Sequence, residues 1–206
     1  MNEKPIIRTI DEFCESEYKE KGSRFIIRVF PAENEGNISA YLNETKKKYF
    51  DATHHCYAYK LLNDKLRYSD AGEPSGTAGI RILNAIEHCE LVNVLIIIIR
   101  YFGGTKLGIG PLGKAYYTAA IQALQKAKII TKHNFNKIII EIDFIFLSQI
   151  MGILSHQDIK ISDVKYGKNV KFVCFIKPEN IENIMLQTKT ASKGTAKIIT
   201  LESIYS

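Results

Sequence analysis

The sequence has few cysteines, and their spacing argues against two classes of small protein. The four cysteines, Cys14, Cys56, Cys89 and Cys174, are scattered along the chain, and no two of them form a C-x-x-C pair. Neither a zinc knuckle nor a disulfide framework is therefore indicated. Free thiols suit a reducing cytoplasm. We expect a cytoplasmic protein that holds no metal and no cofactor.

The sequence also lacks a segment for export or for crossing a membrane. Residues 1–10 include Glu3 and Pro5 and contain no apolar signal core. The apolar run Val94–Ile99 is flanked by Asn93 and Arg100. Its length of about 20 Å falls short of the ~30 Å of a bilayer core. We therefore expect a core strand at this run and no membrane partner.

The charge of the chain is ordinary in amount and slightly unbalanced in sign. Charged residues make up 24% of the 206 residues and hydrophobic residues 46%. This composition is typical of a soluble globular protein with one large domain or two small ones. Lys and Arg number 28 against 22 Asp and Glu, an excess of 6. The excess mildly favours anionic partners such as RNA or ribosomes.

What the sequence does contain is an apolar strand, a glycine-rich loop and an amphipathic helix in direct succession. Val94–Ile99 has no polar alternation, so both faces of this strand must be covered, as at the centre of a sheet packed by helices. Glycines in the loop allow positive φ angles and expose consecutive N–H groups to an anion. The loop glycines are Gly103, Gly104, Gly108 and Gly110.

The helix that follows the loop is expected to pack closely against the sheet. Pro111 fits the first turn, where its missing N–H group costs nothing. Ala115, Ala119, Ala123 and Ala127 recur at every fourth position and form a stripe of small side chains.

Two familiar nucleotide-binding motifs fail in this loop. Gly108, Gly110 and Gly113 match G-x-G-x-x-G, but the next acidic residue is Glu141, too far along to hold a ribose. In the P-loop motif, Ile109 stands where lysine is required. The sequence thus disfavours a dinucleotide site and excludes a P-loop.

A predicted strand over residues 52–62 carries the first candidate catalytic side chains. Period-two alternation places His54 and Cys56 on one face and His55 on the other, so the two histidines cannot share one metal. His54 and Cys56 form two ligands of a metal, a nucleophile and base, or a structural pair inside a sheet, and the sequence shows no third partner for them.

The loop Asp70–Gly79 is rich in turn-forming residues and precedes a helix that runs to about His88. Thr77 is placed to cap that helix. Glu73 is unusual there for a solvated charge, and two roles stay open for it. It accepts hydrogen bonds from loop N–H groups or it acts as a general acid or base.

The remaining chain predicts two domains, 1–132 and 136–206, separated by a polar stretch at 132–136. In the first domain we expect a strand and a helix that follow a charged, exposed opening. The second domain reads β-α-β-β-α-β, which is the ferredoxin-like pattern. The further predicted strands are 23–30, 65–69, 137–144, 160–166, 170–177 and 197–202, and the further helices are 37–50, 147–156 and 178–191.

The two glycine loops together resemble the YigZ/IMPACT family. Its first loop reads Asp-Asp-Gly-Glu-Pro-x-Gly-Thr-Ala-Gly and its second Arg-Tyr-Phe-Gly-Gly-x-x-Leu-Gly, followed by a helix in which Ala-Tyr ends the motif. Here these are Asp70–Gly79, Arg100–Gly108 and Ala115 with Tyr116. The resemblance covers residues 15–130, and the ferredoxin-like tail resembles the C-terminal domain of bacterial members.

This resemblance implies an α+β protein of two domains and a translation-linked binding role. The first domain should share the α/β sandwich of elongation factor G domain IV, and the second should resemble a neighbouring domain of that factor. The family is poorly characterised. Its eukaryotic relatives regulate translation through a protein partner, and bacterial members are suspected of binding nucleic acid.

The sequence departs from the family pattern at several positions. Ala71 replaces the second aspartate, so a mechanism built on paired carboxylates loses one member. Ile109, Pro111 and Lys114 stand where the family usually has Thr, Gly and Arg. Lys114 keeps the positive charge but not the bidentate fork of arginine.

Two functional hypotheses follow, and the first is a binding module. Basic side chains around the loop amides hold phosphates of RNA or of the ribosome, or the same surface contacts a protein of the translation machinery; we favour a monomer. The residues assigned to this surface are Arg100, Gly103, Gly104, Lys106, Gly108, Gly110 and Lys114, with Gly76 and Thr77 of the other loop.

The second hypothesis is a hydrolase-type enzyme that acts on a small anionic substrate bound by the glycine loops. His54, Cys56 or Glu73 would do the acid/base or nucleophilic work, which requires them to lie within hydrogen-bond reach of one another. The loops could equally be a scaffold for tight packing.

Overall fold

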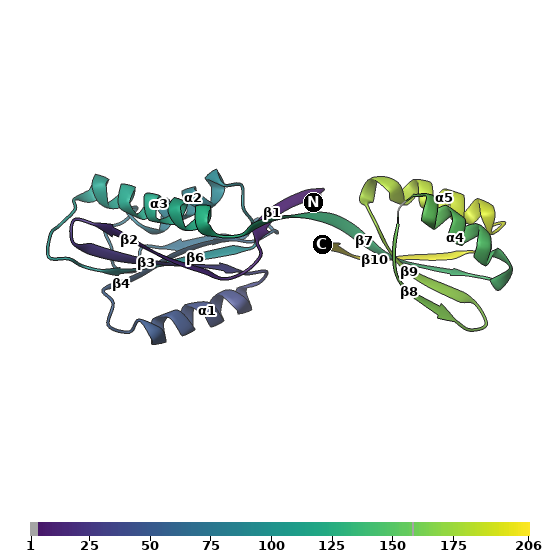
Figure 1. Ribbon diagram of the computed structural model, residues 1–206, viewed down its shortest axis with the longest axis horizontal. Coiled ribbons are helices and arrows are strands. Elements are labelled where there is room, and N and C mark those ends of the chain that lie inside the picture. The colour runs from purple at the N-terminus through teal and green to yellow at the C-terminus, as the bar shows by residue number, and fades with distance from the viewer. Residues whose placement is uncertain (1–3, 158) are drawn as a thin grey trace. The chain divides into compact units, whose positions relative to one another are not determined.

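The computed structural model describes residues 4–157 and 159–206; residues 1–3, with Glu3 of the N-terminal segment, and residue 158 lie outside the described part. The described residues form ten strands, five α-helices and two short 3₁₀ helices. They divide into two compact units, an N-terminal unit, Arg8–Thr131, and a C-terminal unit, 4–7 with 132–206. Each unit combines a sheet with helices (Figure 1), which confirms the predicted two-domain α+β class.

The N-terminal sheet has five strands, and every neighbouring pair is antiparallel. The central strand is the one that contains the apolar run Val94–Ile99, as the sequence predicts. In spatial order the strands are β2 (Cys14–Glu20), β3 (Ser23–Pro31), β6 (Val94–Tyr101), β4 (His54–Lys60) and β5 (Leu66–Ser69).

Helices cover both faces of this sheet (Figure 1). One face lies under α2 (Gly79–His88) and α3 (Ile109–Lys126), the other under α1 (Glu35–Lys48). Ile96 and Ile98 pack on the α2 and α3 side, whereas Ile97 packs on the α1 side, and all three are 0% exposed. The uninterrupted apolar run thus exists because neither face of β6 meets water.

Helix α3 begins where the sequence predicts. Gly108 is its N-cap with a φ of 85°, and Pro111 lies in the first turn. Ala115, Ala119 and Ala123 are buried in the core shared with α2 and the sheet. The small side chains therefore let this helix lie close to its neighbours.

Two stretches to which the sequence assigned no strand contain strands. β1 (Ile6–Ile10) and β2 form in the charged opening. β7 (Ile129–Ile142) runs through the polar stretch at 132–136. In that stretch Asn134 and Asn136 pair with Tyr205 and Ser203 of the last strand. Backbone pairing in a sheet does not depend on apolar side chains, so polar composition alone did not reveal this strand.

The C-terminal unit has the predicted β-α-β-β-α-β order. Strand β7 is flanked by β9 and β10, β8 pairs with β9, and β1 also pairs with β7. Phe144 and Pro178, predicted in a strand and a helix, instead belong to short 3₁₀ turns. The other elements are α4 (Leu147–His156), β8 (Lys160–Tyr166), β9 (Val170–Ile176), α5 (Ile181–Ala191) and β10 (Lys197–Tyr205).

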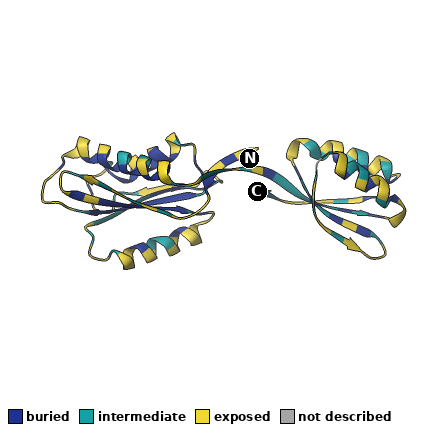
Figure 2. Ribbon diagram, viewed as in Figure 1, coloured by how far each residue is buried: buried dark blue, intermediate teal, exposed yellow. Residues whose placement is uncertain are grey.

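Burial alternates along the C-terminal strands (Figure 2). Ile138, Ile140, Phe172 and Cys174 are 0% exposed and form the core with α4 and α5. Across the described residues of both units, no helix is long and apolar enough to span a membrane.

Candidate functional site

Glu73 is the centre of a buried polar network in the N-terminal unit. Its Oε1 atom accepts hydrogen bonds from Arg100 Nη1 and from Tyr116 Oη, each at 2.7 Å. Its Oε2 atom lies 3.8 Å from Nε2 of His54. The side chains of Glu73 and Arg100 are only 3% and 5% exposed. One loop carboxylate therefore joins residues from β6, α3 and β4.

Cys56 extends the network on the α2 and α3 side of β4. Its Sγ atom lies 3.3 Å from Tyr116 Oη and 3.0 Å from the carbonyl oxygen of Asp70, and the residue is 0% exposed. Burial raises the pKa of the Cys56 thiol to about 12 and raises the pKa of Tyr116 as well. At neutral pH the thiol stays protonated, so it is a poor nucleophile.

The structure thus brings the three predicted catalytic candidates together. His54 and Cys56 share a face of β4, as alternation predicts. Glu73 lies beside His54 and is linked to Cys56 through the hydroxyl of Tyr116. Each nitrogen of the His54 ring faces an oxygen, with Nδ1 2.9 Å from Ala71 O and Nε2 near Glu73. This arrangement fixes the ring but turns neither nitrogen toward a substrate.

Arg100 is buried, although the sequence assigned it to the anion-binding surface. Its Nη2 donates to Ser23 Oγ at 3.1 Å, and its guanidinium lies 5.5 Å from the Phe25 ring and 5.6 Å from the Phe102 ring. Arg100 is therefore the buried counter-ion of Glu73. Strand alternation contained the signal, because Arg100 continues the face of Ile96 and Ile98, which packs under helices.

Tyr116 is the network member that sequence reasoning missed as a functional residue. It is 0% exposed, and its ring packs edge-on against Phe25 with the centroids 5.2 Å apart. A buried tyrosine hydroxyl needs a partner, and Glu73 provides one. The Ala-Tyr end of the helix motif was the available signal.

The first glycine loop satisfies its own backbone groups. Asp70 accepts hydrogen bonds from the N–H groups of Gly76, Ala78 and Gly79 at 2.8 to 2.9 Å. Burial acts to raise the pKa of Asp70, but the bonds from Gly76, Gly79 and Ala78 lower it below its ordinary value.

The predicted capping role of Thr77 is wrong, because α2 has Ala78 at its N-cap position and the Thr77 hydroxyl donates to Pro74 O at 2.6 Å. Asp70 lies far enough back in the loop to reach the first amides of α2, and it performs the capping. The Gly76 amide and the Thr77 hydroxyl, both assigned to anion binding, therefore have internal acceptors.

The second glycine loop has one glycine that packs against backbone and three glycines with free space where a side chain would be. A Cβ atom at Gly103 would overlap the backbone of Gly22, so this position requires glycine. Around Gly104, Gly108 and Gly110 no such obstacle exists: a Cβ would meet nothing within 4 Å at Gly104 and Gly110, and only Pro111 at 3.9 Å at Gly108. The backbone of these three glycines is exposed.

Two lysines, Lys106 and Lys114, are close to these three glycines in the sequence. Lys106 and Lys114 are exposed, and neither forms an ion pair with another residue of the described chain. Phe102 and Ile109 beside them are 47% and 72% exposed. The predicted anion-binding residues that lie at the surface are therefore Lys114 and the residues of the second loop, Gly103, Gly104, Lys106, Gly108 and Gly110.

The described residues contain no group of three His, Cys, Asp or Glu side chains that could hold a metal ion. Ala71, at the position of the family's second aspartate, is exposed with a φ of 44°.

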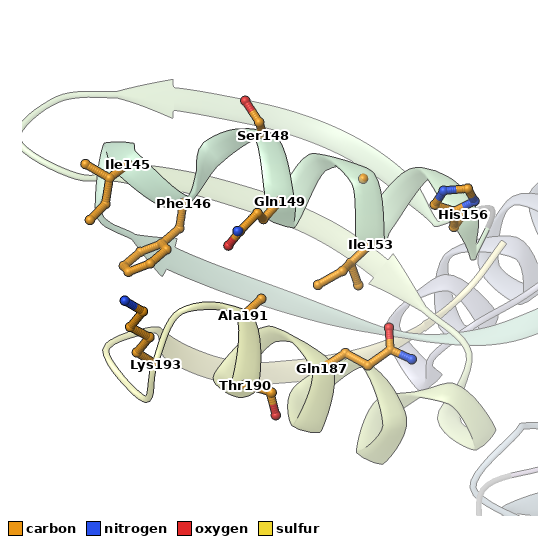
Figure 3. Close-up of a pocket in the computed structure, with 11 residues that line it drawn as sticks. Ile145, Phe146, Ser148, Gln149, Ile153, His156, Gln187, Thr190, Ala191 and Lys193 are labelled. Carbon is orange, nitrogen blue, oxygen red and sulfur yellow. The ribbon is translucent and has the colours of Figure 1, made fainter.

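A groove of about 720 Å³ lies between α4 and α5 of the C-terminal unit (Figure 3). Phe146 and Ile153 line it together with polar side chains, and its ionisable lining residues are His156 and Lys193. These two lie at opposite ends of the groove (Figure 3), so they form no acid/base pair.

Comparison with known proteins identifies the family. Residues 21–124 match the Impact N-terminal domain model. The IMPACT family member YvyE of Bacillus subtilis is 30% identical over 170 residues, which cover 82% of this chain and 78% of YvyE. An IMPACT family member of Thermus thermophilus is 32% identical over 156 residues, which cover 76% of this chain and 85% of that protein.

A solved structure described as that of a hypothetical protein has the same fold, with a TM-score of 0.69 and 24% identity. It covers 97% of this chain, and the match spans 98% of that chain. Because the similarity extends through both units and the family's domain model matches the unit that carries both glycine loops, this chain is a member of the IMPACT family.

Proposed function

We propose that this protein is a translation-linked binding protein that contacts RNA, free or within the ribosome, through its second glycine loop. The observation that carries the proposal is the pair of exposed, unpaired lysines, Lys106 and Lys114, beside the open backbone of Gly104, Gly108 and Gly110. Lysines of this kind neutralise phosphates and release counter-ions on binding.

The start of α3 adds to the attraction for an anion. Gly108 supplies no capping side chain, and the first turn contains no acidic residue. The positive end of the helix dipole therefore lies uncompensated beside the two lysines. The first loop differs, because Asp70 already occupies its amides.

The exposed ring of Phe102 favours RNA over a lone phosphate. Single-stranded nucleic acids combine phosphate contacts with stacking of bases on aromatic side chains. Phe102 is 47% exposed and directly precedes the loop, so a base and its phosphate can both find a contact there.

The test is co-sedimentation with ribosomes and with free RNA across a salt series. We expect Lys106→Glu to weaken binding and to reduce the slope of log K against log salt by about one. Lys47→Glu is the matched control, because Lys47 is an exposed lysine of α1, on the opposite face of the sheet. Equal slopes for the two variants, or no binding at ~50 mM salt, would overturn the proposal.

The alternative, a hydrolase-type enzyme using His54, Cys56 or Glu73, has weaker support. The three residues lie in one network, yet other protein groups hydrogen-bond to His54 Nδ1, to Cys56 Sγ and to Glu73 Oε1. A buried, protonated thiol and a carboxylate held by Arg100 describe a structural core better than a catalytic centre.

We also propose that residues 1–132 and 136–206 are separate domains and that the protein is a cytoplasmic monomer. The change from one compact unit to the other between Thr131 and Lys132 supports the boundary. A protein of the translation machinery is the second partner class for the glycine loop. A complex that survives nuclease treatment would identify that class instead of RNA.

A further inference from the structure

The C-terminal sheet is covered by helices on one face only (Figure 1). Side chains at alternate positions of its strands form the core with α4 and α5. The positions between them point to the other face, because successive side chains of a strand alternate. We call this second set of side chains the open face.

Strand register places the side chains of the open face in three rows. Moving from β10 through β7 and β9 to β8, the rows are Lys197, Glu141, Lys171 and Lys165; Ile199, Ile139, Val173 and Asp163; and, beginning at β7, Lys137, Phe175 and Lys160. A row that is apolar on β10, β7 and β9 and ends in Asp163 on β8, which we call the apolar row, thus lies between two rows that carry lysines.

The lysines of the open face outnumber its acids by five to two. Lys171 lies 3.3 Å from Glu141, and Lys165 lies 3.8 Å from Asp163. Lys137, Lys160 and Lys197 form no ion pair with any other described residue. The face therefore keeps uncompensated positive charge and suits an anionic partner.

Phe175 determines which anionic partner fits best. It lies directly between Lys137 and Lys160 in the third row and borders the apolar row, which includes Val173 and Ile139. Directly opposite residues on neighbouring strands have Cβ atoms about 5 Å apart. A partly exposed aromatic ring thus lies between two lysines on neighbouring strands of the sheet. Single-stranded nucleic acid is recognised through this combination of stacking and charge.

We propose that the open face binds single-stranded RNA, with one base stacked on Phe175 and phosphates held by Lys137 and Lys160. This is a second contact surface, separate from the glycine loop, and it rests on the proposed function only in sharing its class of ligand. Because the three rows contain one aromatic side chain, Phe175, we expect them to hold one stacked base and to have little sequence preference.

The test uses the full chain and an oligouridine probe that carries 4-thiouridine. Ultraviolet cross-linking followed by mass spectrometry should identify the β9 peptide that contains Phe175. In fluorescence titrations Phe175→Leu, which keeps an apolar side chain but loses the aromatic face, should weaken binding about 10-fold. Phe144→Ala is the matched control, because Phe144 is 61% exposed in the same unit but lies outside the open face. Thermal unfolding of each variant shows that the fold is retained.

The outcomes separate this proposal from the previous one. Cross-links confined to residues 102–114, with normal binding by Phe175→Leu, overturn the open-face site and keep the glycine-loop site. Cross-links confined to β9 keep the open-face site and overturn the glycine-loop site. If Lys137→Glu and Lys160→Glu weaken binding but Phe175→Leu does not, the face holds RNA phosphates by charge alone, and the proposed stacking of a base on Phe175 is overturned. Absence of binding overturns both proposals.

Discussion

The two sheets of this protein place their charged side chains in opposite ways. The N-terminal sheet has helices on both faces, and its buried charges, such as Glu73 and Arg100, bind one another. The C-terminal sheet has helices on one face, and lysines such as Lys137 and Lys160 lie on the other. Charge inside the first sheet therefore serves stability, whereas charge on the second remains available to a partner.

A second buried arginine follows the same rule on the α1 face of the N-terminal sheet. Arg28 is 4% exposed. Its guanidinium donates to Thr45 Oγ1 at 2.6 Å and to Glu44 at 2.9 Å, and it packs 4.8 Å from the Phe30 ring. Each face of the sheet thus encloses one arginine with its own acceptors.

The largest effect that distinguishes the two sheets should come from removing one partner of the buried pair. Glu73→Ala leaves Arg100 buried without a counter-ion, which costs about 3–5 kcal/mol of unfolding free energy. The side chain of Glu141, the ion-pair partner of Lys171, is 21% exposed against 3% for Glu73. Glu141→Ala should therefore cost less than about 1 kcal/mol. Denaturant unfolding measures both. Similar losses in the two variants would remove the distinction between the sheets.

A smaller effect should separate the packing glycine from the open ones. Gly103→Ala forces the turn at Gly22 to move and should destabilise the protein by about 1–3 kcal/mol. Gly110→Ala, at a position where a Cβ meets nothing within 4 Å, should leave the thermal unfolding midpoint nearly unchanged. Equal destabilisation would show that the whole loop, and not Gly103 alone, is required for packing.

The smallest effect should appear as a pH dependence of the first loop. Because hydrogen bonds lower the pKa of folded Asp70 below its ordinary 3.8, its carboxylate stabilises the fold above that value. This contribution is lost as pH falls through the folded pKa. Asp70→Asn should therefore be less stable than wild type at pH 7, by about 1 kcal/mol, with the difference shrinking toward pH 3. A difference that is constant with pH would contradict this role.

Much of the fold follows from local pattern. The six apolar residues of β6 predict a central strand, and the succession of strand and helix patterns in the second half of the chain predicts the β-α-β-β-α-β order. The strand through 132–136 was hidden because its partners, residues 203 and 205, lie some seventy positions away. Local composition contains no information about such pairing.

The site was only partly visible in the sequence. His54, Cys56 and Glu73 were identified by residue type, but their type does not say whether they serve chemistry or structure. Arg100 and Tyr116 decide this, because they satisfy the carboxylate and enclose the thiol. Their approach to Glu73 joins segments 27 and 43 positions apart.

The sequence by itself determined the family motifs, the two-domain α+β class and the two covered faces of β6, because periodicity and glycine spacing are local properties. Only the tertiary structure decided that Arg100 neutralises Glu73 while Lys106 and Lys114 remain unpaired at the surface. The physical reason is that the availability of a charge depends on its burial and on nearby opposite charges. Both are set by residues that are distant in the chain.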